Sequence, residues 1–168
     1  PVALAIVWGY SYTKRFTSLS HLALGLGLGV APVGAWIAIR GRIELVPLLL
    51  CAAVTLWTAG FDIIYACQDT EFDRKEGLHS LPARLGERNA LLLSILLHVG
   101  VAIILFLLPT LVPLGPLYHA GAVAAVLLLA YEHTLVRPGD LSRVNAAFFT
   151  TNGFVSIGLM VFTIADVL

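Results

Sequence analysis

The amino-acid sequence predicts an all-α protein built as a polytopic membrane helix bundle, and three observations lead to that prediction. Of the 168 residues, 59% are hydrophobic and 12% are charged, whereas roughly a quarter of the residues in a soluble domain are charged. The mean hydropathy is +0.93. The apolar residues form long uninterrupted runs rather than the alternating pattern of a transmembrane β-barrel, so we expect the spans to be helices.

Five stretches have the length of a membrane-spanning helix. A bilayer core about 30 Å thick requires about 20 apolar residues in a helix. The stretches are residues 19–39, 45–66, 90–108, 117–135 and approximately 146–167. Residues 2–10 have the composition expected for the end of a sixth span. We therefore predict a single transmembrane domain over residues 1–168, with five full transmembrane helices and the end of a sixth.

The distribution of Lys and Arg predicts how the bundle is oriented. If the spans alternate in direction, the loops at residues 13–20, 69–89 and 136–146 lie on one side of the membrane. Eight of the ten Lys and Arg residues are on that side, and Arg40 and Arg42 are on the other. An excess of positive charge marks the cytoplasmic side, so we predict a bacterial-type inner membrane protein with this side in the cytoplasm. The formal net charge is zero, and nothing suggests a nucleic-acid surface.

Charged residues are concentrated in one segment, "DIIYACQDTEFDRKEGLHS" at residues 62–80. Residues 69–88 hold nine of the chain's twenty Asp, Glu, Lys and Arg residues. If the helix that begins near Leu45 continues to about Glu76, a stripe about 80° wide carries four carboxylates and a phenol. These residues are Asp62, Tyr65, Asp69, Asp73 and Glu76. An isolated Asp inside a bilayer is costly, so this acidic stripe requires positive partners.

Three interpretations of the acidic stripe are open from its spacing. The first is a solvated helix end paired with nearby Arg and Lys side chains, which explains Asp73 and Glu76 better than the deeper Asp62. The second is a cation or proton pathway through the bundle. The third is a Mg²⁺ site that bridges Asp carboxylates to a substrate diphosphate, because Mg²⁺ is commonly held by one or two carboxylates together with phosphate oxygens.

Lys14 and Arg15 favour the third interpretation. They lie in "YSYTKRFTS", on the same predicted side of the membrane as the acidic stripe. A cation pathway has no use for two adjacent cationic side chains, whereas a diphosphate carries more negative charge than metal ions alone neutralise. The pair by itself is also typical of a topology signal. Together with the acidic stripe it indicates an anion-binding site.

These residues resemble a known family. A nineteen-residue pattern closely resembles the second Asp-rich motif of the UbiA-type intramembrane aromatic prenyltransferases, and it reads Asp62-x-x-Tyr65-Ala66-x-x-Asp69-x-x-x-Asp73-x-x-x-Gly77-x-x-Ser80. The segment "YSYTKRFTSLSHLALGLGLGVAPVGAWIA" is similar to the one that precedes this motif in bacterial 4-hydroxybenzoate polyprenyltransferases. The resemblance spans essentially the whole chain and implies the C-terminal five to six helices of a nine-helix fold.

The resemblance also implies roles for particular residues. Members of the family join an allylic polyprenyl diphosphate to an aromatic ring. Carried over, Asp69 and Asp73 bind Mg²⁺ against the diphosphate, and Asp62 is a third catalytic carboxylate in the same cavity. The remaining implied diphosphate contacts are Lys14, Arg15, Tyr65 and Asn152. The implied partners are polyprenyl diphosphate, an aromatic acid acceptor and the lipid bilayer, with no nucleic acid and no obligate protein partner.

The chain departs from the family pattern at one point. Family members carry a first Asp-rich motif, Asn-Asp-x-x-Asp-x-x-x-Asp, and this sequence contains no such string. The chain also begins with Pro1 inside an apolar run. We therefore expect a fragment of a longer protein that is inactive on its own.

The acceptor is open between two quinone pathways. 4-Hydroxybenzoate, in ubiquinone synthesis, is the first choice. The segment "ACQDTEFDRKEGLHSLPARLG" also resembles UbiA-like enzymes of menaquinone synthesis by the futalosine route, which prenylate a larger aromatic acid. A hypothesis of another class is a membrane cation or proton transporter that uses Asp62 and Asp69.

Several polar or small residues within the spans also fit simple helix packing. Asn152 fits a hydrogen-bonded packing residue as well as a phosphate contact, and we expect His98 to be a hydrogen-bonded packing residue. Gly25, Gly27 and Gly29 form a small-residue face that would allow a second helix to approach closely.

Overall fold

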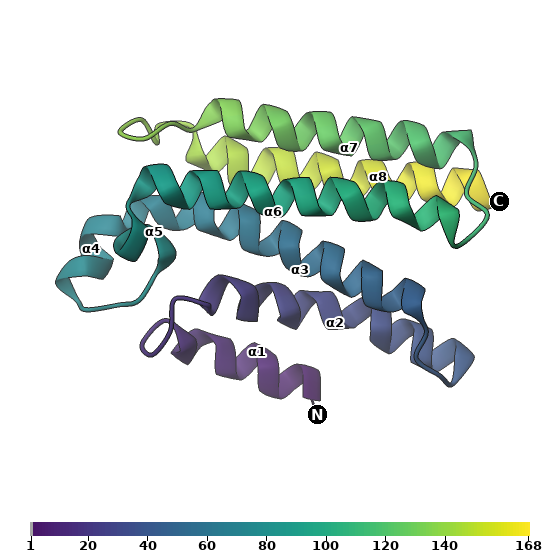
Figure 1. Ribbon diagram of the computed structural model, residues 1–168, viewed down its shortest axis with the longest axis horizontal. Helices are drawn as coiled ribbons and strands as arrows, with labels where there is room; N and C mark the ends of the chain where they lie inside the picture. The colour runs from purple at the N-terminus through teal and green to yellow at the C-terminus, as the bar shows by residue number, and fades with distance from the viewer. Residues whose placement is uncertain (1) are drawn as a thin grey trace.

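The computed structural model describes residues 2–168, apart from the side chains at positions 2, 3, 6, 7, 10 and 11. The described residues form helices and no strand (Figure 1). The elements are α1 (Val2–Thr13), α2 (Ser20–Arg40), α3 (Leu45–Ala66), the 3₁₀ turn η1 (Cys67–Asp69), α4 (Thr70–Lys75), α5 (Leu81–Leu85), α6 (Glu87–Leu107), the 3₁₀ turn η2 (Leu108–Thr110), α7 (Pro116–Leu135), the π-helical turn η3 (Ala146–Thr151) and α8 (Asn152–Val167).

The long helices lie where the apolar stretches predict them. Four of the predicted spans are long and apolar enough to cross a membrane, and they run over Ser20–Arg40, Leu45–Lys75, Glu87–Thr110 and Ala146–Val167. The fifth, α7, is a helix of 20 residues but is less apolar, because it carries His119, Glu132 and His133. The all-α membrane bundle is therefore confirmed, while the number of full spans stays a prediction.

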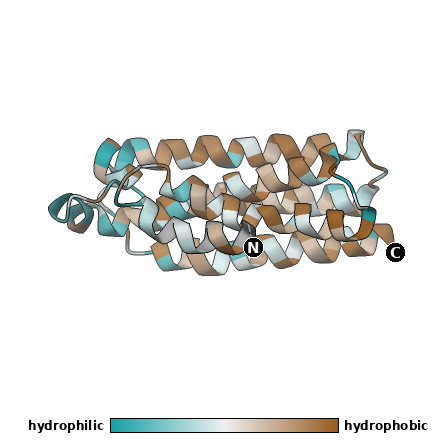
Figure 2. Cartoon of the chain, turned by 90° about the horizontal axis from the view of Figure 1, so that it is seen from below, coloured by the Kyte–Doolittle hydropathy of each residue, from teal (hydrophilic) through white to brown (hydrophobic). Residues whose placement is uncertain are grey.

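The helices run antiparallel, so the connections gather at two ends of the bundle (Figure 1). One end, called the α4–α5 end, carries the α1–α2 turn, α4, α5 and the α7–α8 loop. The other end carries the α2–α3 and α6–α7 turns and the C-terminus. This arrangement agrees with the predicted alternation of loops. Hydrophilic residues gather at the ends and most conspicuously at the α4–α5 end, whereas the middle of the bundle is hydrophobic (Figure 2).

Gly25 and Gly29, two of the three glycines of the predicted small-residue face, bring α2 and α3 into close contact. A Cβ atom added at Gly25 would collide with the carbonyl oxygen of Thr55, and one added at Gly29 would lie 2.7 Å from the carbonyl oxygen of Cys51. A third glycine of the same helix, Gly34, has open space where its Cβ would be. The close approach of the α2 and α3 backbones therefore requires glycine at positions 25 and 29, which face α3, and does not require it at position 34.

Two clusters of buried apolar residues fill the bundle, and the first of them determines how far Asp62 and Tyr65 are exposed. The cluster nearer the α4–α5 end includes Ile63, Ile64 and Ala90, each fully buried. The second cluster lies deeper and includes Ala122 and Leu129 of α7. Because Ile63 and Ile64 face the first cluster, their neighbours Asp62 and Tyr65 remain partly exposed at its edge.

Candidate active site

The acidic segment is helical but not one continuous α-helix. α3 ends at Ala66, η1 makes a 3₁₀ turn, and α4 resumes at Thr70. The hydroxyl of Thr70 donates to the carbonyl oxygen of Cys67 at 2.8 Å, which stabilises the tighter turn. A 3₁₀ turn advances about 120° per residue instead of about 100°, so it rotates the residues after it.

The predicted acidic stripe is therefore only partly correct. Asp62 is partly exposed, Asp69 is exposed and Asp73 is fully buried, which means that the three carboxylates do not share one environment. Glu76 lies beyond the last residue of α4 and is exposed. The 3₁₀ turn is the physical reason for this difference.

Asp73 forms an ion pair with Lys14. The Nζ of Lys14 lies 2.8 Å from Oδ1 of Asp73, with the Asp side chain 0% exposed and the Lys side chain 29% exposed. Neither oxygen of Asp73 has a well-directed hydrogen bond from the described residues. A buried carboxylate needs a nearby cation, because desolvating a charge costs several kcal/mol. Lys14, predicted as a diphosphate contact, is thus also the counterion of a predicted metal ligand.

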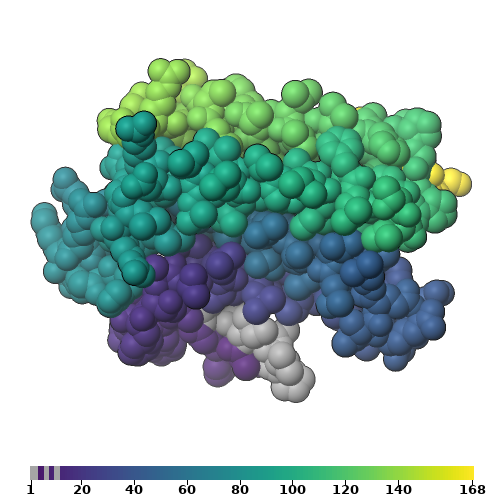
Figure 3. Space-filling model, in the orientation of Figure 1, coloured from purple at the N-terminus to yellow at the C-terminus, as the bar shows by residue number. Residues whose placement is uncertain are grey.

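Backbone contacts hold this ion pair in place. The N–H of His79 donates to the carbonyl oxygen of Lys14 at 2.8 Å, and the N–H of Leu78 donates to the carbonyl oxygen of Asp73 at 2.8 Å. The chain reverses at Gly77, whose φ of +66° favours glycine. The α1–α2 turn and the α4–α5 segment consequently lie side by side on the surface (Figure 3).

Asp62 is bound by a histidine that the sequence analysis missed. The Nδ1 of His21 lies 2.6 Å from Oδ2 of Asp62, and the His side chain is 3% exposed. Its Nε2 lies 3.4 Å from the backbone nitrogen of Leu81. The available signal was a polar residue in the first turn of an apolar span, close in sequence to Lys14, but one sequence does not reveal its partner.

Tyr65 belongs to an aromatic row between α3 and η3. Its ring centroid lies 4.4 Å from that of Phe148 and 6.2 Å from that of Phe149. Phe61 continues the row, with its centroid 5.2 Å from Phe148 and 5.5 Å from Trp57. The phenol of Tyr65 therefore sits at the edge of an apolar aromatic surface that leads from the acidic residues into the bundle.

Asn152 has a different role from the predicted diphosphate contact. Its Nδ2 lies 3.0 Å from the carbonyl oxygen of Phe148, 3.1 Å from that of Ala147 and 3.2 Å from Oε1 of Glu132. Its Oδ1 accepts a hydrogen bond from the indole N–H of Trp57 at 2.7 Å. The carbonyl groups belong to the π-helical turn, whose wider geometry leaves them available to a side chain. These contacts occupy the N–H groups of the amide, which favours the packing interpretation of Asn152.

A buried acid and two histidines extend this network. Glu132 is 0% exposed, and its Oε2 lies 3.9 Å from Nδ1 of His98. The rings of His98 and His133 are joined by a contact of 2.9 Å between Nδ1 and Nε2. The prediction that His98 is a hydrogen-bonded packing residue is confirmed. Glu132 was not predicted, although an acid inside an apolar helix is itself a signal.

Arg15 lies at the surface beside the ion pair. Its guanidinium carbon is 5.8 Å from the centroid of the Tyr12 ring, within the range of a cation–π contact. The side chain is exposed, so it remains accessible to a ligand that approaches the α4–α5 end.

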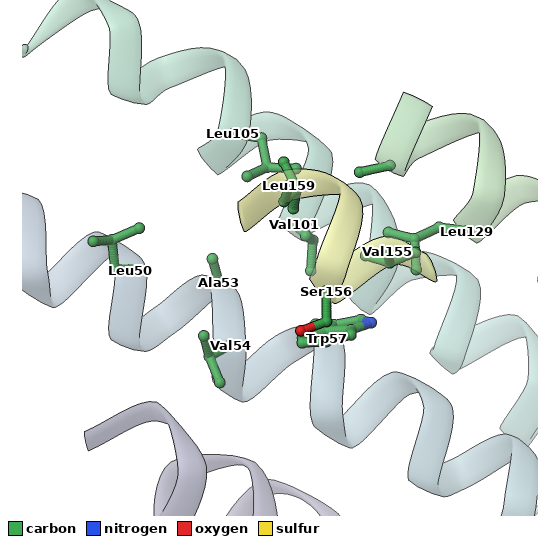
Figure 4. Close-up of a pocket in the computed structure, with 11 residues that line it drawn as sticks. Leu50, Ala53, Val54, Trp57, Val101, Leu105, Leu129, Val155, Ser156 and Leu159 are labelled. Atoms are coloured by element: carbon green, nitrogen blue, oxygen red, sulfur yellow. The ribbon is translucent and has the colours of Figure 1, made fainter. Parts of the chain in front are cut away.

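An apolar cavity lies deeper in the bundle than these charged residues. Its volume is about 200 Å³, and α3, α6, α7 and α8 line it. Trp57 of α3 lies beside Ser156 of α8 at one end, and aliphatic side chains such as Leu50 and Leu105 line the rest (Figure 4). The aromatic row ends at Trp57, which also lines this cavity.

Asp69 and Asp73 fit a Mg²⁺ site in which a bound ligand supplies further oxygen atoms. They do not form a closed metal site made of protein ligands alone. Among the described residues, no three His, Cys, Asp or Glu side chains come close enough together to hold a metal ion. The predicted ligands Asp69 and Asp73 are hard oxygen donors, and the buried carboxylate of Asp73 lacks directed hydrogen bonds. Mg²⁺ commonly uses one or two carboxylates, with waters and phosphate oxygens as its other ligands.

Comparison with known proteins assigns the chain to a family. The model of the UbiA prenyltransferase family matches residues 1–156. The chain belongs to the UbiA prenyltransferase family. The resemblance inferred from the Asp-rich pattern is therefore confirmed.

Curated members of the UbiA family are similar over most of this chain. A 4-hydroxybenzoate octaprenyltransferase of Marinobacter nauticus is 33% identical over 153 residues, which cover 89% of this chain and 52% of the relative. Proteins of the same name from Xanthomonas euvesicatoria and Escherichia coli are 34% and 30% identical, over 91% and 95% of this chain and 50% and 54% of their own lengths. The chain thus spans about half the length of the curated relatives that it matches.

A solved structure supports the UbiA fold. The apo structure of a UbiA homolog from Aeropyrum pernix K1 superposes with a TM-score of 0.88 at 34% sequence identity. The match covers 100% of this chain and 62% of that one. The bundle described above therefore has the fold of a UbiA protein.

Proposed function

We propose that the protein carrying this chain transfers a polyprenyl group from polyprenyl diphosphate to an aromatic acid in respiratory quinone synthesis. The first candidate acceptor is 4-hydroxybenzoate, in line with the names of the curated relatives. The observation that carries the proposal is the buried Asp73 carboxylate held by the Nζ of Lys14 at 2.8 Å. In this pair, a carboxylate oxygen, which is the kind of ligand that Mg²⁺ prefers, lies next to an ammonium group, which can bind phosphate.

In this proposal the cations bind the leaving diphosphate. Lys14 is 29% exposed, so its ammonium group is placed to contact a ligand as well as Asp73. Arg15 presents an exposed planar guanidinium suited to bidentate contact with phosphate oxygens. Neutralising the diphosphate makes it a better leaving group for cleavage of the allylic C–O bond.

Asp69 and Asp73 are the residues that we propose hold Mg²⁺, with Asp62 as a third catalytic carboxylate nearby. When bound, Mg²⁺ supplies positive charge that stabilises the departing diphosphate. Tyr65 is the first ring of the aromatic row. Its phenol can donate a hydrogen bond to a phosphate oxygen, and its ring face can stabilise an allylic cation.

The apolar interior protects the reaction from water. An allylic cation is quenched by water, so the site must exclude it before the electron-rich ring of the acceptor attacks. The aromatic row from Tyr65 to Trp57 and the cavity of about 200 Å³ beyond it provide an apolar surface for the prenyl group.

The proposed location of the active site is the cytoplasmic side of a bacterial-type inner membrane. Eight of the ten Lys and Arg residues belong to the loops of the α4–α5 end, and such a bias marks cytoplasmic loops. The 168 residues alone are proposed to be inactive, because they lack the first Asp-rich motif of the family.

The test is a prenyl transfer assay with membranes that contain the full protein carrying this chain. Labelled polyprenyl diphosphate and Mg²⁺ are incubated with 4-hydroxybenzoate, or with the larger aromatic acid of the futalosine route of menaquinone synthesis. We expect Asp69→Asn and Asp73→Asn each to lower the rate at least about 10-fold. Asp140→Asn is the matched control, since Asp140 is exposed in the α7–α8 loop and bonds Ser142.

The outcomes separate the possibilities. Equal rates for wild type and Asp69→Asn would show that the metal assignment is wrong. Absence of any prenylated acid would contradict the enzymatic proposal and favour a transporter that uses the intramembrane acids. Prenylation of only the larger acid would move the protein to the menaquinone route.

A further inference from the structure

His21 is a nearly fully enclosed polar side chain at the candidate site, and the proposed chemistry leaves it without a role. It lies in the first turn of α2 with its side chain 3% exposed. One ring nitrogen contacts Asp62 on α3, and the other faces the backbone of Leu81 at the start of α5. Three elements that are distant in the sequence therefore meet at this imidazole.

The two contacts determine the tautomer of His21. The backbone N–H of Leu81 can only donate a hydrogen bond, so Nε2 of His21, 3.4 Å away, acts as the acceptor. In a neutral imidazole the other nitrogen then carries the hydrogen. The Nδ1–H group consequently donates to Oδ2 of Asp62 across 2.6 Å.

This arrangement leaves half of the Asp62 carboxylate available. Oδ2 is bound by His21, while the Asp62 side chain as a whole is 23% exposed. A neutral imidazole orients the carboxylate without adding a cation that would compete with Mg²⁺ or with Lys14. The hydrogen bond also limits rotation of the carboxylate, because the ring is itself fixed by Leu81.

We propose that His21 is a positioning residue that orients Asp62 toward the reacting ligands through the Nδ1–H hydrogen bond. The inference rests on the proposed prenyl transfer for its kinetic consequence. His21 itself does not touch substrate. It acts as residues behind metal ligands and catalytic groups do, where removal of the supporting hydrogen bond typically costs about 10- to 100-fold in activity.

Three substitutions at one position test the direction of the hydrogen bond. His21→Asn places an amide nitrogen close to the position of Nδ1 and retains a donor to Asp62. His21→Gln places its amide closer to the position of Nε2 and loses that donor, while His21→Ala loses both contacts. We expect His21→Ala and His21→Gln to lower kcat about 10- to 100-fold, with little change in KM for polyprenyl diphosphate. His21→Asn should stay within about threefold of wild type, well below the loss expected for the other two variants.

A matched histidine controls for general effects of substitution. His119 is exposed in α7 and contacts the carbonyl oxygen of Gly115 at the opposite end of the bundle. His119→Ala should therefore leave kcat and KM unchanged. The combination of His21→Ala with Asp62→Ala should be no slower than the slower single variant, since each change alone removes one partner of the same hydrogen bond.

A spectroscopic measurement tests the tautomer without relying on activity. In the protein labelled with ¹⁵N-histidine, the His21 signals, identified by their loss in His21→Asn, should show a protonated Nδ1 and an unprotonated Nε2. A protonated Nε2 would overturn the proposal. So would an active enzyme in which the Ala, Gln and Asn variants have equal rates.

Failure of the proposed function has a different signature. If no aromatic acid is prenylated, the kinetic role of His21 falls together with the proposed reaction, while the predicted tautomer still stands or falls by the NMR result. If wild type is active and the three variants are indistinguishable, prenyl transfer stands and the positioning role is wrong.

Discussion

Trp57 and Asn152 join α3 to α8 through a single hydrogen bond, although 95 positions separate them in the sequence. The indole N–H donates to Oδ1 of Asn152 across 2.7 Å. The same amide also bonds the π-helical turn and Glu132. One side chain therefore connects the wall of the apolar cavity, the aromatic row and a buried acid.

Asn152→Ala should destabilise the protein without weakening diphosphate binding. Removal of the amide leaves the Trp57 indole N–H and one Glu132 oxygen without partners, and each buried unsatisfied group costs about 1–3 kcal/mol. The checks are thermal unfolding in detergent and the Kd for a polyprenyl diphosphate analogue. An unchanged unfolding temperature with a much larger Kd would restore the phosphate role of Asn152.

Lys14→Met should be more harmful to stability than removal of its partner carboxylate. It leaves the fully buried Asp73 without a cation, and breaking a buried pair costs about 3–5 kcal/mol. Because Lys14 is 29% exposed, solvent screening reduces the expected loss to about 1–3 kcal/mol.

A double variant and a substitution of the neighbouring Arg15 test whether the loss of stability in Lys14→Met comes from the ion pair. In thermal unfolding, Lys14→Met with Asp73→Asn should recover much of the stability lost by Lys14→Met alone. Arg15→Met removes the adjacent exposed cation and should leave the unfolding temperature unchanged while weakening diphosphate binding. Equal destabilisation by Lys14→Met and Arg15→Met would contradict the ion-pair account.

Gly25→Ala should destabilise the bundle, whereas Gly34→Ala on the same helix should not. The new Cβ at Gly25 meets the backbone of Thr55, which cannot move aside as a flexible side chain would. Overpacking of this kind costs about 1–3 kcal/mol. Gly34 faces open space, so it controls for the change in helix propensity. Equal unfolding temperatures of the two variants would argue against close α2–α3 packing.

A cysteine-labelling experiment tests the membrane orientation. Ser142→Cys lies in the α7–α8 loop and Arg42→Cys in the α2–α3 turn, and both parent residues are exposed. In intact cells, an impermeant thiol reagent should label Arg42→Cys and leave Ser142→Cys unlabelled until the membrane is opened. The native Cys51 and Cys67 are replaced by Ala in both variants. The reverse pattern would place the α4–α5 end outside the cytoplasm.

The sequence predicted the features that depend on local composition. Long apolar runs specify the helices, and glycine spacing specifies the close face of α2, because each is a property of neighbouring residues. The α4–α5 end was also predictable, since the helices alternate and each span must cross the bilayer. Lys14 and the Asp-rich pattern were identified from charge and spacing in the same way.

Other features depend on partners that are distant in the sequence. His21 and Asp62 are 41 positions apart, and nothing in either local sequence indicates that they meet. The 3₁₀ turn at Cys67 escaped prediction because the same residues are compatible with an α-helix. Asn152 was ambiguous until its four partners were known.

The Lys14–Asp73 pair has a kinetic consequence for turnover. In the proposed reaction, a diphosphate shares Lys14 with a carboxylate already 2.8 Å away, so part of its attraction to Lys14 is offset by the weakening of the Lys14–Asp73 ion pair. The backbone hydrogen bond from His79 to Lys14 joins the two segments that carry the pair. In the proposed reaction, departure of the diphosphate restores the full ion pair, and this resting contact favours release of the spent diphosphate over its retention.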